Sequence, residues 1–128
     1  MAHNPHHVHL IREMAEMFEP IFSKSPQAIY LYLDDEHKIC NKKFAQLLGY
    51  SSPQQWVDNL YPVDDVSKED QEKAINAYMD ASRRCKASTL SVTWKAKNGK
   101  KVPTVVILAP IFYQGEVFVL HFISKKTK

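Results

Sequence analysis

The alternation of apolar and polar residues divides the chain into an N-terminal helix and a mixed α+β domain. From Val8 to Phe22 apolar residues recur at helical spacing, and charged residues occupy the opposite face. Pro20 lies within this pattern and is expected to kink or end the helix near Glu19. The predicted organisation is a disordered His-rich tail at 1–7, an amphipathic cap helix at 8–24, a folded domain at 25–124 and the start of a linker or tail at 125–128.

The folded domain is expected to begin with two short strands and two capped helices. Residues 28–34 alternate aliphatic side chains with tyrosines, which predicts a strand, and residues 38–40 form a second strand after a polar turn. Helices are predicted at 42–48 and 53–59. Each has start or stop signals: Asn41 and Ser52 as N-caps, Gly49 as the left-handed closing residue, Pro53 in the first turn and Gln55 reaching back.

A long helix and three strands complete the predicted domain. Ser67, with Asp70 three residues on as a variant of the capping box, marks a helix start, and the helix is expected to run to about Cys85. Strands are predicted at 89–97, 102–113 and 116–124, separated by the turns Asn98-Gly99 and Gln114-Gly115. The last two strands are apolar on both faces, so both faces must be covered. The amphipathic N-terminal helix, alone or with a partner subunit, is the candidate for the second face.

The run from Asn41 to Tyr50 resembles the middle of the PAS sensory domain, where an Asn-capped helix ending in Leu-Gly-Tyr follows two short strands. Asn98-Gly99 stands where that family usually has Asp-Gly, and Phe122-Ile123-Ser124 resembles its Asp-Ile-Thr end signal, with Phe in place of Asp. The resemblance covers roughly 26–124. It implies an α+β PAS fold: a five-stranded antiparallel sheet with helices on one face and the N-terminal amphipathic helix on the other.

The resemblance also implies a site and an interface. Ten residues are expected to face a pocket between the sheet and the helices: Phe44, Leu48, Ile75, Tyr78, Val92, Trp94, Thr104, Val106, Phe118 and Leu120. Ten others are expected to form the contact between the N-terminal helix and the outer sheet face, or a dimer: Leu10, Ile11, Met14, Met17, Phe18, Val105, Ile107, Val119, His121 and Ile123.

By resemblance, the chain is a sensory and signal-transduction domain that binds a small ligand or a partner and relays the event through homodimer packing to an output domain or partner protein. An alternative is the input region of a histidine kinase of a two-component system, a cyclic-dinucleotide enzyme or a transcription regulator. A second alternative is a small α+β pocket enzyme of the isomerase or dehydratase kind. We expect no enzymatic activity, because no acid or histidine is placed in the pocket beside Trp94.

Composition narrows the partners and the compartment. The net charge of +3, with scattered basic residues, does not favour nucleic acid. Two cysteines are too few for a disulfide-dependent secreted domain, so both are expected to be reduced thiols in a cytoplasmic protein. No apolar run is long enough to insert into a membrane.

The cofactor is left open, with two classes argued against. Cysteinyl-flavin photochemistry needs a cysteine directly after the helix-capping Asn, but Lys42 follows Asn41 and Cys40 precedes it. Haem sensing usually needs a histidine on the long helix, and no histidine lies between His37 and His121.

Other polar groups are assigned structural roles. The N-terminal histidines have irregular spacing and are interpreted as a solvated tail, so no metal ligand is assigned; they are His3, His6, His7 and His9. His121 is interpreted as a hydrogen-bonded packing residue or a dimer contact. The acidic runs at 34–36 and 64–65 are assigned to turns rather than to acid–base chemistry.

Overall fold

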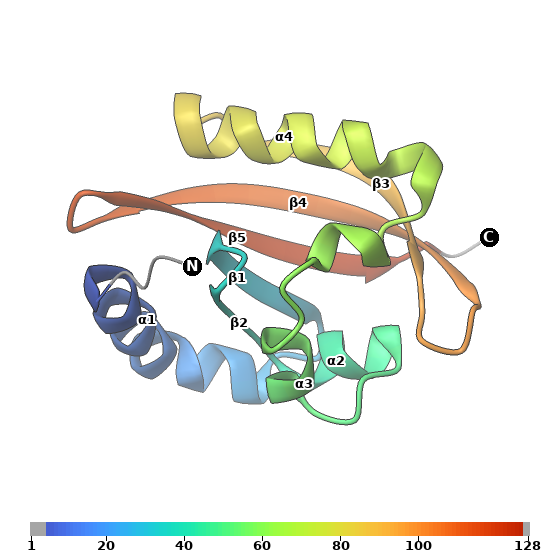
Figure 1. Ribbon diagram of the computed structural model, residues 1–128, viewed down its shortest axis with the longest axis horizontal. Helices are drawn as coiled ribbons and strands as arrows, with labels where there is room; N and C mark the ends of the chain where they lie inside the picture. The colour runs from blue at the N-terminus through green and yellow to red at the C-terminus, as the bar shows by residue number, and fades with distance from the viewer. Residues whose placement is uncertain (1–4, 127–128) are drawn as a thin grey trace.

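The computed structural model describes residues 5–126, and the strands form one five-stranded antiparallel sheet in the order β2-β1-β5-β4-β3. The elements are α1 (Pro5–Lys24), β1 (Ala28–Asp34), β2 (His37–Cys40), α2 (Lys42–Leu48), α3 (Pro53–Val57), the 3₁₀ helices η1 (Pro62–Asp65) and η2 (Lys68–Asp70), α4 (Gln71–Arg84), β3 (Ser88–Lys95), β4 (Lys101–Tyr113) and β5 (Glu116–Lys125). The predicted α+β class and antiparallel sheet are confirmed. Figure 1 shows α1 and α4 on opposite sides of the long strands.

Helices α2 and α3 form where their capping residues predict. The Asn41 side-chain oxygen accepts a hydrogen bond from Phe44 N at 3.0 Å and another from Ile29 N at 3.1 Å, so one side chain caps α2 and ties it to β1. Gly49 closes α2 at φ 82°, a left-handed conformation that strains other residues. Ser52 accepts from Gln55 N, and the Gln55 side chain accepts in return from the backbone N–H of Ser51.

Helix α4 begins later than its sequence signal suggests. Ser67 precedes the short 3₁₀ helix η2, and α4 follows at Gln71. Asp70 does not reach back to cap this turn; its carboxylate accepts from the backbone N–H of Thr93 at 2.8 Å. The predicted capping interaction is therefore replaced by a bond that fastens the start of α4 to β3.

The two hairpins differ in turn geometry. At Gln114-Gly115 both residues have positive φ, and Tyr113 pairs directly with Glu116, as a two-residue turn requires. At Asn98-Gly99 only Gly99 has positive φ, and the loop is wider, because the ladder ends at the pair Lys95 and Lys101.

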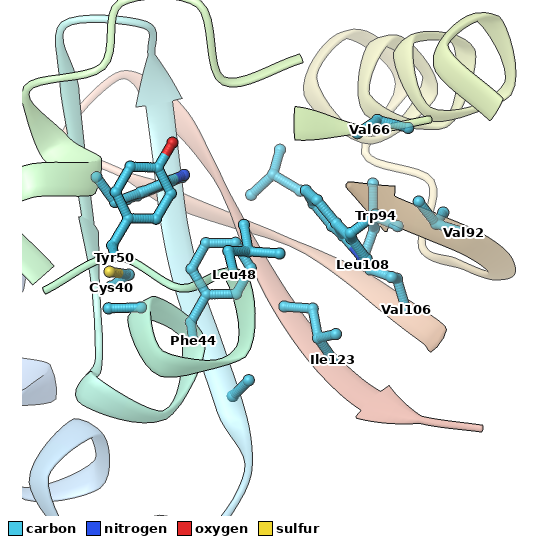
Figure 2. Close-up of a cluster of buried hydrophobic side chains, with 14 of the residues drawn as sticks. Cys40, Phe44, Leu48, Tyr50, Val66, Val92, Trp94, Val106, Leu108 and Ile123 are labelled. Atoms are coloured by element: carbon cyan, nitrogen blue, oxygen red, sulfur yellow. The ribbon is translucent and has the colours of Figure 1, made fainter. Parts of the chain in front are cut away.

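The sheet separates two cores. The core on the inner face, toward α2, α3 and α4, includes Phe44, Leu48, Trp56, Trp94 and Val106. Figure 2 shows Ile123 of β5 in this core, on the same side of the sheet as Val106 and Leu108. The core on the outer face lies beneath α1, and its buried residues are Leu10, Met14, Ile29, Leu31, Leu33, Phe118 and Leu120.

Helix α1 is longer than predicted at its start. It begins at Pro5, so the prediction of a disordered tail is wrong for residues 5–7, and residues 1–4 lie outside the described part of the chain. It also continues through Pro20 to Lys24. The last turn persists because Phe18 and Phe22 pack against the outer core on either side of the proline.

Candidate ligand site

A cavity of about 120 Å³ lies between the inner face of the sheet and the helices. Its apolar wall comes from α4, β3 and β4, and is made of Ala74, Ile75, Leu90, Val92, Val106 and Leu108. Its aromatic and polar wall comes from β1, the turn after it, α3, α4, β3 and β5, and is made of Tyr30, Tyr32, Asp35, Trp56, Tyr78, Trp94 and His121. Pro62, Val63 and Val66 complete the lining.

Tyr30 is the centre of the aromatic wall. Its ring is stacked on the imidazole of His121, with centroids 3.9 Å apart and an interplanar angle of 13°. On other sides it contacts Phe44 at 4.8 Å and Trp56 at 5.1 Å between centroids. Burial raises the pKa of the Tyr30 phenol, so the hydroxyl keeps its proton at physiological pH. Tyr30 is thus an uncharged ring packed among aromatic side chains of β5, α2 and α3.

Trp94 is held in place by a buried hydrogen-bond chain. Its indole Nε1–H donates to Thr104 Oγ1 at 3.0 Å, and the Thr104 hydroxyl donates to the Val92 carbonyl at 2.6 Å. Thr104 is fully buried, and its hydroxyl is occupied by this chain. Trp94 therefore presents a fixed face to the cavity.

The rim of the cavity near the β1–β2 turn is polar. The Tyr32 hydroxyl donates to the Asp35 carboxylate, and the Tyr78 hydroxyl donates to the Leu33 carbonyl at 3.2 Å. The Tyr32 and Tyr78 rings meet edge to face, with centroids 4.9 Å apart. The Tyr78 bond connects α4 to the end of β1 across the rim.

Lys38 is a buried cation that supports the same region. Its ammonium group donates to the carbonyls of Val57 at 2.9 Å and Asn59 at 2.8 Å, and also to the carbonyl of Asp35. Burial lowers the pKa of Lys38, while nearby carboxylates oppose the shift. Three carbonyls thus satisfy the ammonium and hold the end of α3 beside the cavity.

His121 brings an imidazole into the cavity wall. Its Nδ1 lies 3.1 Å from the Val119 carbonyl, which can only accept, so Nδ1 carries the proton and Nε2 offers a lone pair. Burial lowers the pKa of His121 to about 3, and the bond to Val119 only partly offsets this. The ring is therefore neutral near pH 7. Within residues 5–126 the ring makes its hydrogen bond through Nδ1 and not through Nε2.

Trp56 adds a second polar atom without a partner. The residue lines the cavity and is 1% exposed, and within residues 5–126 its Nε1–H makes no hydrogen bond. A buried N–H without an acceptor is unfavourable by about 1–3 kcal/mol. The wall therefore offers an acceptor at His121 Nε2 and an unsatisfied donor at Trp56 Nε1.

A family model described as "PAS domain" matches residues 26–124, almost the whole of the chain beyond α1. The chain belongs to the PAS domain family. It is a PAS sensory domain, and domains of this family are generally not enzymes. No curated protein matches the chain.

Solved structures with the same fold agree with this assignment. A PAS domain from a two-component sensor histidine kinase has a TM-score of 0.66 at 18% identity, over 90% of this chain and 99% of that chain. The PAS domain of an HTR-like protein from Haloarcula marismortui has a TM-score of 0.62 at 16% identity, over 96% and 100%. The LOV protein of Rhodobacter sphaeroides has a TM-score of 0.71 at 16% identity, over 89% and 67%. At these identities the likeness concerns the fold.

Half of the residues predicted to face the PAS pocket line the cavity: Ile75, Tyr78, Val92, Trp94 and Val106. Phe44 and Leu48 lie in the inner core, but they pack behind the cavity wall and not on its surface. Thr104 also faces inward, where it anchors Trp94. The residues that the sequence did not assign to the pocket include Tyr30, Tyr32, Asp35, Trp56 and His121.

The predicted orientation of β5 is wrong. Phe118 and Leu120 face α1, while Val119 and Ile123 lie in the inner core and His121 lines the cavity. The antiparallel register explains the error, since Val106 pairs with Ile123 and Leu108 pairs with His121. Paired residues share a face, so inward-facing Val106 and Leu108 bring the odd-numbered residues of β5 inward.

The prediction of a pocket without an acid or histidine is also wrong: the register of β5 accounts for His121, and the turn after β1 brings in Asp35. His121 and Asp35 both line the cavity, together with Trp94. Neither has the properties of a general base, which needs a pKa near the working pH. The pKa of His121 is too low, and Asp35 is exposed and already accepts a hydrogen bond from Tyr32.

On the outer face α1 covers part of the predicted interface. Leu10 and Met14 are buried against the sheet, and Ile11 and Phe18 pack beside them. Val105 and Ile107 face outward as predicted but lie outside the core beneath α1; Ile107 is 44% exposed. Met17 is 52% exposed on the far side of the helix. None of the described helices has the length and apolar character needed to cross a membrane.

Proposed function

We propose that this PAS domain binds a small molecule in the inner cavity and transmits its presence to α1 through β1 and β5. The observation that carries the proposal is that both strands have a cavity side and an α1 side. His121 of β5 lines the cavity, while its neighbour Leu120 packs in the core beneath α1. A shift of either strand therefore acts on both cores.

The same arrangement recurs on β1. Tyr30 and Tyr32 line the cavity, and the residues between and beside them, Ile29, Leu31 and Leu33, are buried beneath α1. The two strands are neighbours, and Tyr30 pairs with His121 across the ladder. A ligand that displaces the stacked rings of Tyr30 and His121 therefore acts on β1 and β5 together, at the position where these two residues pair. Coupling between two sites in a protein is typically about 1–3 kcal/mol.

The size and lining of the cavity favour a compact ligand. Sites for drug-sized ligands are about 300–1,000 Å³, whereas a cavity of about 150 Å³ holds benzene. At about 120 Å³, this cavity accommodates about one ring. His121 Nε2 can accept a hydrogen bond and Trp56 Nε1–H lacks an acceptor, and a hydroxyl group can act as either donor or acceptor. We therefore infer a small aromatic or cyclic molecule that carries a hydroxyl group.

Phenol and toluene test this inference, because they differ in one polar group. In calorimetric titrations we expect phenol to bind saturably and toluene to bind about three- to tenfold more weakly, which is the effect of one hydrogen bond. His121→Phe should reduce phenol affinity toward that of toluene. Val105→Ala, on the outer face, should leave both affinities unchanged. Equal binding of both compounds would contradict the hydroxyl-bearing ligand, and binding of neither would contradict the ligand site.

We further propose that the output of the domain is a change in homodimer packing. Support comes from apolar side chains that remain uncovered on α1 and the neighbouring sheet face: Met17 is 52%, Ile21 49% and Ile107 44% exposed. Exposed apolar side chains that gather on one face are typical of a protein contact. Similar solved structures include a PAS domain of a sensor histidine kinase and the N-terminal domain of a diguanylate cyclase, which supports an output domain of one of these two classes.

A sensory role is favoured over an enzymatic one by the state of His121. An isomerase or dehydratase needs a base that takes a proton near neutral pH, and an imidazole with a pKa of about 3 is too weak for this step. The same imidazole remains a good hydrogen-bond acceptor. The polar lining of the cavity is therefore suited to recognition of a ligand.

A further inference from the structure

Two histidines and a carboxylate meet at the start of α1, on the outer side of the molecule. His7 lies in the first turn of α1, Asp34 ends β1 and His37 begins β2. One ligand atom from each lies within 4.8 Å of the other two. Among residues 5–126 this is the one cluster of that kind. It shows that the interpretation of the N-terminal histidines as a solvated tail is wrong for His7.

The donor atoms converge on the Asp34 carboxylate. His7 Nδ1 lies 2.7 Å from Asp34 Oδ2, and His37 Nδ1 lies 2.7 Å from Asp34 Oδ1. The His7 and His37 rings meet edge to face, with centroids 5.6 Å apart. Both imidazoles are largely enclosed, with side-chain exposures of 18% and 8%. Two imidazoles and one carboxylate form a ligand set suited to Zn²⁺ and related divalent ions.

Neighbouring groups orient these ligands. Glu116, at the start of β5, lies 3.2 Å from His7 Nε2; when Nε2–H donates to this carboxylate, the Nδ1 lone pair is directed toward Asp34. Asp34 Oδ1 accepts from the backbone N–H groups of Glu36 at 3.0 Å and His37 at 2.8 Å, which fixes the carboxylate. Metal-binding histidines are commonly oriented by such an outer carboxylate.

We propose that His7, Asp34 and His37 bind a divalent transition-metal ion, with Glu116 as the positioning residue for His7. Two ligand atoms of a tetrahedral zinc site are about 3.3 Å apart, given metal–ligand distances of about 2.0–2.1 Å. Each His–Asp separation of 2.7 Å therefore has to widen by about 0.6 Å. The ion takes the place of the protons that the two Nδ1 atoms share with Asp34, so binding releases protons.

The consequence is a metal-dependent attachment of α1 to the sheet. Asp34 and His37 flank the β1–β2 turn, whereas His7 comes from the distant α1, and Figure 1 shows the first turns of α1 near the tip of the β4–β5 hairpin, where Glu116 lies. A bound ion fixes the first turn of α1, the element proposed above to relay the signal. The metal site itself stands apart from the inner cavity, because its residues do not line it.

The test is a calorimetric titration of the full chain with Zn²⁺ in a background that lacks competing ligands. The background variant carries His3→Gln, His6→Gln, His9→Gln and Cys85→Ser, which removes the other N-terminal histidines and the exposed thiol. We expect this background to bind one equivalent. Adding Asp34→Asn should weaken binding at least about tenfold, and asparagine keeps the oxygen that accepts from the two backbone N–H groups.

Two further variants and a second readout separate a metal site from a general structural role. His37→Gln should weaken binding as strongly as Asp34→Asn, and Glu116→Gln by about tenfold or more through loss of orientation. In hydrogen exchange, Zn²⁺ should protect the first turn of α1 in the background variant and not in Asp34→Asn. Zinc binding that disappears in the background, or that persists unchanged in both Asp34→Asn and His37→Gln, would overturn the proposal. Neither result bears on phenol binding in the cavity.

Discussion

His121 provides a sharp test of the β5 register, because a buried neutral histidine makes stability depend on pH. Burial lowers its pKa from 6.5 to about 3 in the folded protein. Below about pH 6.5 the unfolded chain takes up a proton that the folded chain does not, so the free energy of unfolding falls as the pH decreases from about 6.5 toward 3. His121→Phe removes this proton uptake and keeps a flat ring to stack on Tyr30.

The size of the effect follows from the pKa difference. Each pH unit between the two pKa values changes stability by about 1.4 kcal/mol, so lowering the pH to about 5 removes about 2 kcal/mol through His121. Other titrating groups, including Asp34, are common to both proteins. The difference in pH dependence between wild type and His121→Phe therefore isolates the contribution of His121.

Urea unfolding at pH 7 and at pH 5 measures this difference. Wild type should lose about 2 kcal/mol more than His121→Phe between these two pH values. Equal losses in the two proteins would refute the reasoning, because they would mean that water solvates His121 in the folded state. Such a result would contradict the placement of His121 in the buried cavity wall.

Three other changes test separate parts of the structure. Phe118→Ala should lower the free energy of unfolding by about 3–5 kcal/mol because Phe118 is fully buried beneath α1. Ile107→Ala should change it by about 0.5 kcal/mol or less. Similar urea midpoints for the two variants would contradict the placement of Phe118 in the outer core. Asn41→Ala should be destabilising by about 2–3 kcal/mol in the same assay, and Asn41→Asp, which keeps the capping oxygen, by clearly less; equal losses would exclude the cap. Met17→Glu should convert a dimer to a monomer in light scattering without changing the circular dichroism spectrum, and a wild-type monomer would contradict the proposed interface.

The helices around the inner core could be predicted because their signals are local. The capping hydrogen bonds of Asn41, Gly49 and Ser52 lie within four residues of each cap, so the sequence alone indicates where α2 begins and ends and where α3 begins. Asp70 shows the limit of such signals. Its carboxylate accepts a hydrogen bond from Thr93 on a distant strand and not from the backbone of its own helix start. The choice between these two partners depends on tertiary structure.

The face of β5 could not be predicted from its composition, because both sides of the strand are apolar. The run from Phe118 to Ile123 contains no alternation that separates the two cores. A different signal was present in the sequence. A two-residue turn at Gln114-Gly115 pairs Tyr113 with Glu116, and counting back from that pair places Val106 opposite Ile123. An inward Val106 therefore requires an inward Ile123.

The role of His7 had no local signal. The first turn of α1 has no acidic residue, and the groups that hold it, Asp34 and Glu116, lie far along the sequence. The same applies to Tyr30, whose partner His121 is on a strand at the other end of the chain. Contacts of this kind depend on sheet order and register, which the alternation of residues does not encode.

The central claim is that the cavity and α1 are coupled through β1 and β5. Its most direct test is methyl NMR of the full chain during a phenol titration, observing Val106 in the cavity wall and Met14 on α1. We predict that both methyl signals shift and that both reach saturation with the same Kd. A saturating shift of Val106 with no change at Met14 would contradict the coupling.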